Sequence, residues 1–178
     1  MEKTKIRPAE TRDREELVKM RLQMQRHMEA SNPGIWRITE EGMLQTGPDV
    51  DGTLSDEDGR VLVAEENGTV IGFAHGHVAR RNAYTPKVVG HIKTIYVKEP
   101  KRRRGVGSRL VKELCLFFRA EGVEEVNLRY VLGNKEAEGF WRSLGFNPVI
   151  QTANTPLDAL ERRLKIRPEQ SKPFKKTF

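Results

Sequence analysis

The feature that most constrains the fold is a basic turn with two glycines, Arg102-Arg103-Arg104-Gly105-Val106-Gly107, which separates two runs of different periodicity. Before the turn, His91 to Val97 is rich in β-branched and aromatic residues, as half-buried strands are, and Pro100 ends this run. After the turn, apolar residues recur at helical spacing as far as Phe118. The sequence therefore predicts a strand, a tight turn and a helix whose first turn contains the glycines.

The predicted turn has the chemistry of a phosphate-binding site. Unpaired backbone N–H groups and the positive end of the helix dipole meet at a helix N-terminus. Gly105 and Gly107 lack the Cβ that would hold a phosphate away, and Arg102 to Arg104 supply charge-assisted hydrogen bonds. A capped surface helix after a solvated basic turn is the alternative interpretation, because short glycine motifs often occur without a ligand.

Two other phosphate-binding motifs do not match the turn. A Walker loop ends in Gly-Lys followed by Ser or Thr, which this chain does not contain. A dinucleotide fingerprint needs a third glycine, and Leu110 stands at that position.

Three segments in the right order resemble the GNAT superfamily of acetyl-CoA-dependent N-acetyltransferases. Arg102-x-x-Gly105-x-Gly107 is similar to the acyl-CoA pyrophosphate loop of that family. Ile95-Tyr96-Val97 is similar to its fourth strand, whose backbone pairs with the pantetheine arm. The segment from Asn134 to Phe146 is similar to its last helix and following strand, where the asparagine contacts the cofactor. The resemblance extends over roughly residues 3 to 166.

The resemblance implies a fold, a reaction and a set of cofactor-binding residues. The implied fold is α/β (α+β mixed sheet), with a mostly antiparallel sheet of about six to seven strands and about four flanking helices. The implied enzyme is an acyltransferase that moves the acetyl group of acetyl-CoA directly to an amine, without a metal. The implied contacts with acetyl-CoA come from Ile95, Tyr96, Val97, Arg102, Arg103, Arg104, Gly105, Val106, Gly107, Ser108 and Asn134.

The acid/base residues of many family members are missing from this chain. Where those members have a glutamate base on the fifth strand and a tyrosine acid on the last helix, this chain has Arg129 and Trp141. Tryptophan donates a hydrogen bond but has no usable acid pKa. Another branch of the family places its base at the beginning of the fourth strand, where this chain has His91. A histidine pKa near 6.5 suits that role, although a strand histidine bonded to a backbone carbonyl is the alternative.

Three further side chains are candidates for the acceptor side of the reaction. Tyr130 is a candidate to protonate the leaving thiolate, with Tyr96 or solvent as alternatives. Arg129, if it points into the acceptor cleft, would favour a carboxylate-bearing substrate; a solvated strand arginine is the alternative. Trp36 either lines the acceptor site or covers the core.

Length and composition set the wider expectations. The 178 residues predict one domain over 1–166 and a basic tail over 167–178, which accounts for part of the net charge of +7. Only one cysteine is present, no apolar run could span a membrane and no secretory signal begins the chain, so we expect a cytoplasmic protein. His75 and His77 share a strand face, but two histidines without a third ligand do not predict a metal site.

The sequence leaves three functions to compare. The first is transfer of an acetyl group from acetyl-CoA to a small-molecule or peptide amine. The second is a catalytically weak or inactive acyl-CoA-binding module, because the acid/base pair is missing. The third is nucleic-acid binding through the tail, which would be sensitive to salt. The expected partners are acetyl-CoA and an amine acceptor, not a membrane or nucleic acid, and a homodimer is left open.

Periodicity and turn residues also predict the order of the elements. Asn67-Gly68 indicates a hairpin, and the proline, glycines and aspartates of 47–59 indicate a loop. The predicted strands are 5–8, 61–65, 69–78, one that begins at 88, 126–132, 146–152 and 160–164, the last ambiguous with a helix. The predicted helices are one that begins near 11–13, a short one over 39–46, one that begins after Gly105 and a last one over 135–144.

Overall fold

The computed structural model describes residues 4–166, and these residues form one five-stranded sheet. The strands lie in chain order, and only the last pair, β4 and β5, is parallel. This mostly antiparallel mixed sheet confirms the predicted fold class, with fewer strands than expected. The strands are β1 Lys5–Pro8, β2 Gly59–Glu66, β3 Thr69–Arg80, β4 Val88–Val97 and β5 Glu125–Leu128.

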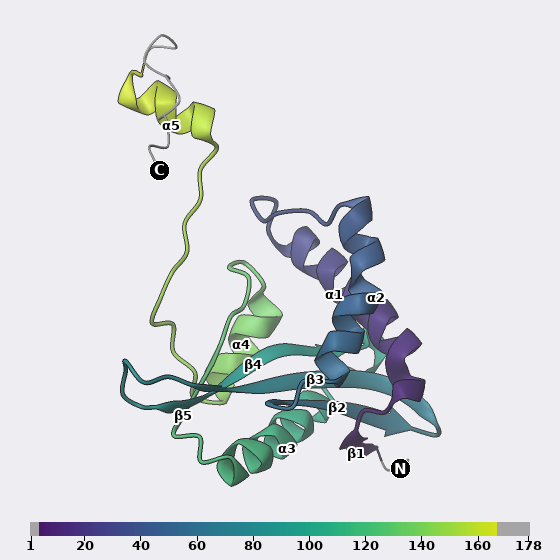
Figure 1. Cartoon of the computed structure of the whole chain (residues 1–178). Helices are drawn as coiled ribbons and strands as arrows, with labels where there is room; N and C mark the ends of the chain where they lie inside the picture. The colour runs from purple at the N-terminus through teal and green to yellow at the C-terminus, as the bar shows by residue number, and fades with distance from the viewer. Residues whose placement is uncertain (1–3, 167–178) are drawn as a thin grey trace, which may run out of the picture. The chain divides into compact units, whose positions relative to one another are not determined.

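Helices cover both faces of the sheet. The helices α1 and α2 lie over one face, and α3 lies over the other (Figure 1). Two short 3-10 turns, Thr11–Asp13 and Glu99–Lys101, precede α1 and the basic turn. The five helices of the described residues are α1 Arg14–Ser31, α2 Glu40–Leu54, α3 Val106–Ala120, α4 Lys135–Ser143 and α5 Leu157–Leu164.

The described residues divide into two compact units, one up to Phe140 and one from Trp141 onward. The first unit contains the whole sheet with α1, α2 and α3, and the second contains α5. A single domain over 1–166 stays a prediction, and the predicted tail, 167–178, lies outside the described residues. Within 4–166, no helix has the length and apolar character needed to cross a membrane.

The face of the sheet under α1 and α2 holds one half of the core. Leu17 and Met20 of α1 and Val50 of α2 pack there against Val63 of β2 and Phe73 of β3. These helices are amphipathic, and their apolar sides are buried while their charged sides face solvent. Burial of apolar side chains on this face therefore places the two helices above β2, β3 and β4.

The opposite face is packed unusually closely against α3. A Cβ on Gly76 of β3 would lie 2.8 Å from Cζ of Phe118, and one on Gly90 of β4 would lie 3.0 Å from its Cδ1. Phe118, Leu110 and Leu114 of α3 are buried, at 2%, 0% and 0% exposure. The two glycines are therefore required by the close approach of α3 to the sheet.

The helix α2 corrects the predicted loop at 47–59, because the helix continues to Leu54 with Pro48 inside it. It begins as predicted at Thr39, whose hydroxyl accepts a hydrogen bond from the Gly42 N–H. An interior proline costs a helix about 3 kcal/mol. Val50 is only 2% exposed and Leu54 packs against the same core, and burial of each side chain of this kind contributes about 1.5–3 kcal/mol. Packing that the local residue pattern does not reveal thus overrides the turn signal.

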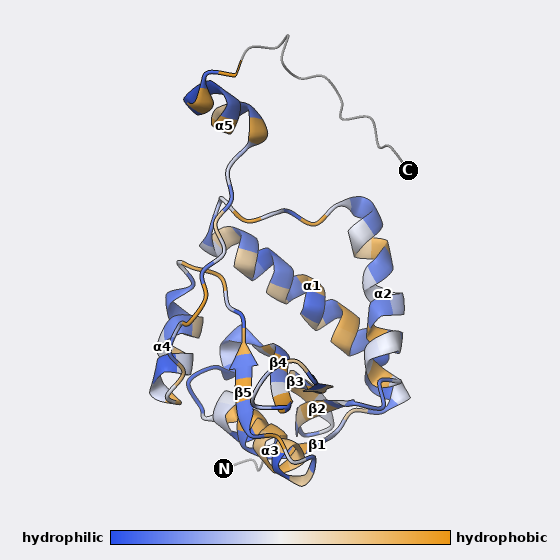
Figure 2. Ribbon diagram, turned by 60° about the vertical axis from the view of Figure 1, so that its left-hand side comes forward, coloured by the Kyte–Doolittle hydropathy of each residue, from blue (hydrophilic) through white to orange (hydrophobic). Residues whose placement is uncertain are grey.

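The predicted strand at 146–152 is wrong, and the segment 160–164, which the sequence left between strand and helix, is helical. Residues 146–156 form no helix or strand, and Val149 and Ile150 are 88% and 87% exposed. Pro148 lacks the N–H that a strand would donate. Residues 157–164 form α5, in which leucines at helical spacing alternate with charged residues (Figure 2).

The remaining element predictions are confirmed, with small changes of boundary. Asn67 and Gly68 have φ of 51° and 73° and join β2 to β3 as a tight hairpin turn. The fifth strand ends at Leu128, earlier than the predicted Leu132. The helix after the basic turn, α3, begins at Val106 as predicted.

Candidate active site

The strand β4 has a free edge beyond Ile92. Its parallel pairing with β5 covers only Val89 to Ile92. At Lys93 a bulge interrupts its pairing with β3, because His75 lies opposite Thr94 while Gly76 lies opposite Ile92. Within the described residues, the stretch from Thr94 to Val97 therefore pairs with β3 alone. Its outward backbone groups are available to an extended ligand, as in recognition by strand addition.

The basic turn lies directly after this free edge and presents an uncapped helix N-terminus. Gly105, the N-cap of α3, has φ of 73° and provides no side-chain cap. The N–H groups of Val106, Gly107 and Ser108 donate to no atom among the described residues. A Cβ on Gly105 would have no protein atom within 4 Å. Backbone donors and open space therefore meet at the positive end of the helix dipole.

The second glycine has a different role from the first. A Cβ on Gly107 would lie 3.3 Å from Cζ of Phe140, a residue of α4, and 3.9 Å from Cδ1 of Ile95. Gly107 therefore allows α3 to lie close to α4 and β4. The sequence predicts that both glycines admit a phosphate, and the structure adds a tight contact with Phe140 as a second reason for a small residue at 107.

The arginines of the turn also differ from one another. Arg102 donates from Nε to the Val97 carbonyl at 3.0 Å and from Nη1 to Glu136 at 2.9 Å, and its guanidinium lies over the Tyr96 ring. Arg102 thus joins the end of β4 to α4. Arg103 is exposed, with φ of 58°, and has no ion pair among the described residues.

A buried carboxylate lies under the turn. Glu66, at the end of β2, accepts a short hydrogen bond from Lys101, and its Oε1 lies 3.5 Å from Nη2 of Arg104. The hydrogen bond from Lys101 lowers the pKa of Glu66, so this carboxylate stays charged at neutral pH. Glu66 therefore offsets part of the positive charge of the turn and ties it to β2.

His91 lies on β4 and hydrogen-bonds to a side chain of β5. Its Nδ1 forms a short hydrogen bond with Oδ1 of Asn127, which is its register partner. An amide oxygen only accepts, so Nδ1 carries the hydrogen and Nε2 holds the lone pair. Burial lowers the pKa of His91 more than Asn127 raises it, and the charge of Lys93 lowers it further. His91 is therefore neutral at physiological pH, as a proton acceptor must be.

A second histidine extends this polar row across the sheet. His77 of β3 lies opposite His91, and its Nδ1 is 2.7 Å from Oδ2 of Asp56. Burial would raise the pKa of Asp56, but the hydrogen bond and charge of His77 lower it overall. Asp56, His77, His91 and Asn127 thus form a polar row. Among residues 4–166, no group of three His, Cys, Asp or Glu side chains could hold a metal ion.

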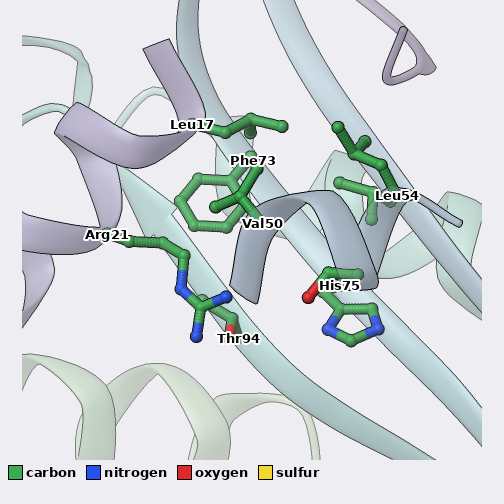
Figure 3. A pocket seen from close by; sticks show the side chains of 9 residues that line it. Leu17, Arg21, Val50, Leu54, Phe73, His75 and Thr94 are labelled. Carbon is green, nitrogen blue, oxygen red and sulfur yellow. The ribbon is translucent and has the colours of Figure 1, made fainter. Parts of the chain in front are cut away.

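A small cavity lies beside the polar row, between the sheet and the helices α1 and α2. Its volume is about 10 Å³, space for one water molecule. His75 lines it with Arg21 of α1 and Thr94 of β4 (Figure 3). Burial lowers the pKa of His75 to about 4, and its buried Nε2 has no hydrogen-bond partner. The remaining lining residues are Leu17, Val50, Thr53, Leu54, Val61 and Phe73.

The other predicted site residues lie on loops and helix ends. Arg129 is exposed and Tyr130 is half-buried, both directly after β5. Trp36 is 74% exposed in the segment between α1 and α2, so it does not cover the core. Asn134 caps α4, because its Oδ1 accepts a hydrogen bond from the Ala137 N–H at 3.0 Å.

Two residues beside the site were missed by reasoning from sequence. Asn127 is recognisable only once β5 is placed in register with β4, which brings it to His91. Arg21 lies on α1, far from every motif, and reaches the cavity only because α1 packs on the sheet. No sequence signal distinguishes either residue from an ordinary surface polar residue.

The profile of the acetyltransferase (GNAT) family matches residues 22–146, and the chain belongs to this family. Members of the family use acetyl-CoA as co-substrate. No curated protein matches the chain in sequence.

Several solved structures share the fold. A tetramutant of the BH1408 protein from Bacillus halodurans has a TM-score of 0.75 and 22% identity, covering 86% of this chain and 99% of that one. The aminoglycoside N-acetyltransferase AAC(6')-Iy in complex with CoA has a TM-score of 0.67 and 19% identity, covering 88% of this chain and 95% of that one. The aminoglycoside 6'-N-acetyltransferase AAC(6')-IG from Acinetobacter haemolyticus has a TM-score of 0.67 and 20% identity, covering 85% of this chain and 97% of that one.

Proposed function

We propose that the protein is an N-acetyltransferase that moves the acetyl group of acetyl-CoA directly to a primary amine. One observation carries the proposal. Three features follow one another along β4: the neutral His91, the strand edge that β5 leaves free after Ile92, and the uncapped start of α3 directly after the strand. A donor with an extended arm and an anionic end matches this arrangement.

The described residues suit acetyl-CoA. The N–H groups of Val106, Gly107 and Ser108, with Arg103 and Arg104, would hold the pyrophosphate, and Gly105 leaves it room. The backbone of Ile95, Tyr96 and Val97 would pair with the pantetheine arm. Arg102 would act by fixing the end of β4, and Asn134 would use its amide N–H groups, which no described residue accepts.

His91 is the proposed base. Acetyl-CoA supplies a thioester whose C–S bond breaks as the amine nitrogen forms a C–N bond with the carbonyl carbon. The nitrogen must lose a proton, and Nε2 of His91 has the free lone pair to accept it. Tyr130 is proposed to return a proton to the departing thiolate sulfur. The Tyr96 hydroxyl is a weaker candidate, because it faces Gln23 at 3.4 Å.

The acceptor is proposed to be a small-molecule or peptide amine that contacts Trp36 and Arg129, both exposed. Two of the structural neighbours are aminoglycoside N-acetyltransferases, so aminoglycosides belong in the set of amines to be tested. A cytoplasmic location stays a prediction, and tail-mediated nucleic-acid binding stays the third candidate function that the sequence offers.

Acetyl transfer is tested by thiol release from acetyl-CoA over a panel of amines, amino acids, peptides and aminoglycosides. We expect amine-dependent release that falls at least about 100-fold in a His91→Ala variant, since general-base catalysis contributes about 10²–10⁴-fold. Tight binding of CoA without thiol release from any amine would contradict the proposal. That result would favour an acyl-CoA-binding module, the second candidate, which the buried Trp141 in place of an acid supports.

The donor site has a test of its own with a matched control. Gly105→Ala places a methyl group where the phosphate would lie and should weaken CoA binding by at least about 10-fold in calorimetry. Gly68→Ala is the control, because Gly68 has the same φ of 73° and equally open surroundings in the β2–β3 turn. Equal CoA affinity in the two variants would contradict a phosphate site at Gly105.

A further inference from the structure

Arg21 differs from the other half-buried arginines. Among residues 4–166, Arg21 is the only half-buried arginine whose guanidinium has no hydrogen bond, ion pair or aromatic ring as a partner. The others each have a hydrogen-bond acceptor in a carboxylate or a backbone carbonyl: Arg7, Arg14, Arg81, Arg102 and Arg109. A charged group that is partly removed from water needs a partner to offset its desolvation.

The acids of the surrounding helix are already engaged. Glu16, near the start of α1, pairs with Lys98 at 2.6 Å. Glu29, further along α1, accepts hydrogen bonds from Gln25 and from the Ile38 N–H. The positions one turn from Arg21 are Leu17 and Gln25, and neither is acidic. The chain therefore supplies no carboxylate to this guanidinium within the described residues.

Arg21 shares its cavity with a second polar group that lacks a partner. It extends from α1 toward Thr94, while the His75 ring lies across the same cavity (Figure 3). The Nε2 atom of His75 is buried without a hydrogen bond. Thr94 is two residues beyond Ile92, where the free edge of β4 begins, and lies on the same sheet face as His91. Two groups without partners thus lie on the face of the sheet that carries the proposed base.

We propose that Arg21 binds a carboxylate of the acceptor, so that the acetylated amine belongs to a small amino acid or a related amino-carboxylic acid. The guanidinium suits this group, because it offers two parallel N–H donors that match a planar carboxylate. The second donor to this carboxylate is Nε2 of His75, in the tautomer of the ring that carries its hydrogen on Nε2.

The same charges disfavour a polycationic acceptor. Lys93, in the β4 bulge, adds a second positive charge that acts on both His75 and His91. Asp56, the acid of the polar row, is already paired with His77. A polycationic aminoglycoside would therefore meet like charges at this end of the site, where an amino acid would meet a complementary one.

The inference rests on the proposed acetyl transfer, and matched acceptors test it. Each ω-amino acid is compared with the alkylamine of equal chain length in a thiol-release assay, so that the pair differs in the carboxylate alone. A bond between a guanidinium and a carboxylate contributes about 1.5–3 kcal/mol, so the wild type should favour the amino acid by about 10–100-fold in kcat/KM. Equal rates for both members, or faster turnover of aminoglycosides, would overturn the inference while leaving acetyl transfer intact.

Variants of α1 assign the preference to Arg21. Arg21→Gln should raise KM for the ω-amino acids by about 10–100-fold and leave kcat and the alkylamines nearly unchanged. Arg26→Gln, an exposed arginine of the same helix, is the matched control and should change neither. Equal losses for both acceptors in Arg21→Gln would assign Arg21 a structural role and refute the inference.

A binding measurement separates this inference from the proposed function. Calorimetric titration of the CoA-bound protein with 5-aminovalerate needs no catalysis. Wild type and Arg26→Gln should bind it, and Arg21→Gln should lose at least about 10-fold in affinity while binding CoA as wild type does. If 5-aminovalerate binds in an Arg21-dependent way but no amine releases thiol from acetyl-CoA, the proposed acetyl transfer is refuted and the carboxylate site is not. Binding of 5-aminovalerate that is equal in wild type and Arg21→Gln, or too weak to detect in wild type, would refute the carboxylate site.

Discussion

At the scale of single residues, the state of His91 depends on a neutral partner. Asn127 fixes the hydrogen on Nδ1 without adding a negative charge, while burial and Lys93 lower the pKa of the ring. A carboxylate at 127 would make the same hydrogen bond but would stabilise the protonated ring. The choice of asparagine thus keeps Nε2 free to accept a proton at neutral pH.

The first prediction concerns Asn127→Asp. A base with a lowered pKa is active above that pKa, so the wild-type rate should rise with pH below about 6.5 and level off near neutrality. The aspartate should raise the pKa of His91 by about 1–2 units and move this acidic limb to higher pH by the same amount. The pH profile of kcat/KM measures the shift, and the acceptor's own titration cancels between the two enzymes. Superimposable profiles would exclude His91 as the titrating base.

At the scale of elements, α2 shows an apolar core overriding a local turn signal. Pro48 breaks the hydrogen-bond ladder of α2, yet the helix continues because Val50 is buried beyond it. Pro48→Ala should restore one backbone hydrogen bond and raise the free energy of unfolding by about 1–3 kcal/mol. Gly52→Ala, in the same helix with open space around its Cβ, should add about 0.5–1 kcal/mol and serves as reference. Denaturant unfolding gives both values, and a destabilised Pro48→Ala would indicate that the packing of α2 needs the proline.

The same contrast explains how much of the fold the sequence predicts. The β2–β3 hairpin, the strand β4 and the start of α3 follow from signals within a few residues, such as Asn67-Gly68 and the glycines of the basic turn. The full length of α2 depends on packing between distant segments, which no local pattern contains. Around Val149 and Ile150 the error is the opposite one, because the local pattern predicts a strand that the structure does not form. β-Branched residues form a strand only beside a partner strand, and these two side chains are exposed.

The site divides in the same way. The basic turn is predicted as a phosphate site because its residues are contiguous in sequence, and His91 is predicted as the base because the family resemblance implies a base at this distance before the turn. The turn's arginines looked equivalent, yet Arg102 serves β4 and α4 whereas Arg103 is free of ion pairs within the described residues. Asn127 and Arg21 reach the site through strand register and helix packing. Residues of this kind are chosen by tertiary contacts and carry no mark in the sequence.

At the scale of the whole molecule, the two faces of the sheet have different roles. The face under α3 is apolar, and its glycines allow Phe118 to lie directly against the strands. The face under α1 and α2 carries the polar row and the cavity beside it. A mutation under α3 should therefore change stability, and a mutation in the polar row should change catalysis.

The last prediction tests this division with Phe118→Ala. Phe118 is 2% exposed, and truncation of such a side chain costs about 3–5 kcal/mol of unfolding free energy. The melting temperature should fall by about 6–20 °C, measured by circular dichroism. Well below that temperature, KM and kcat should stay within about two-fold of wild type, because only folded molecules act and the polar row is untouched. Leu116→Ala, an exposed residue of α3, is the control and should change neither quantity. A large rise in KM in folded Phe118→Ala would show that α3 packing sets the geometry of the polar row as well.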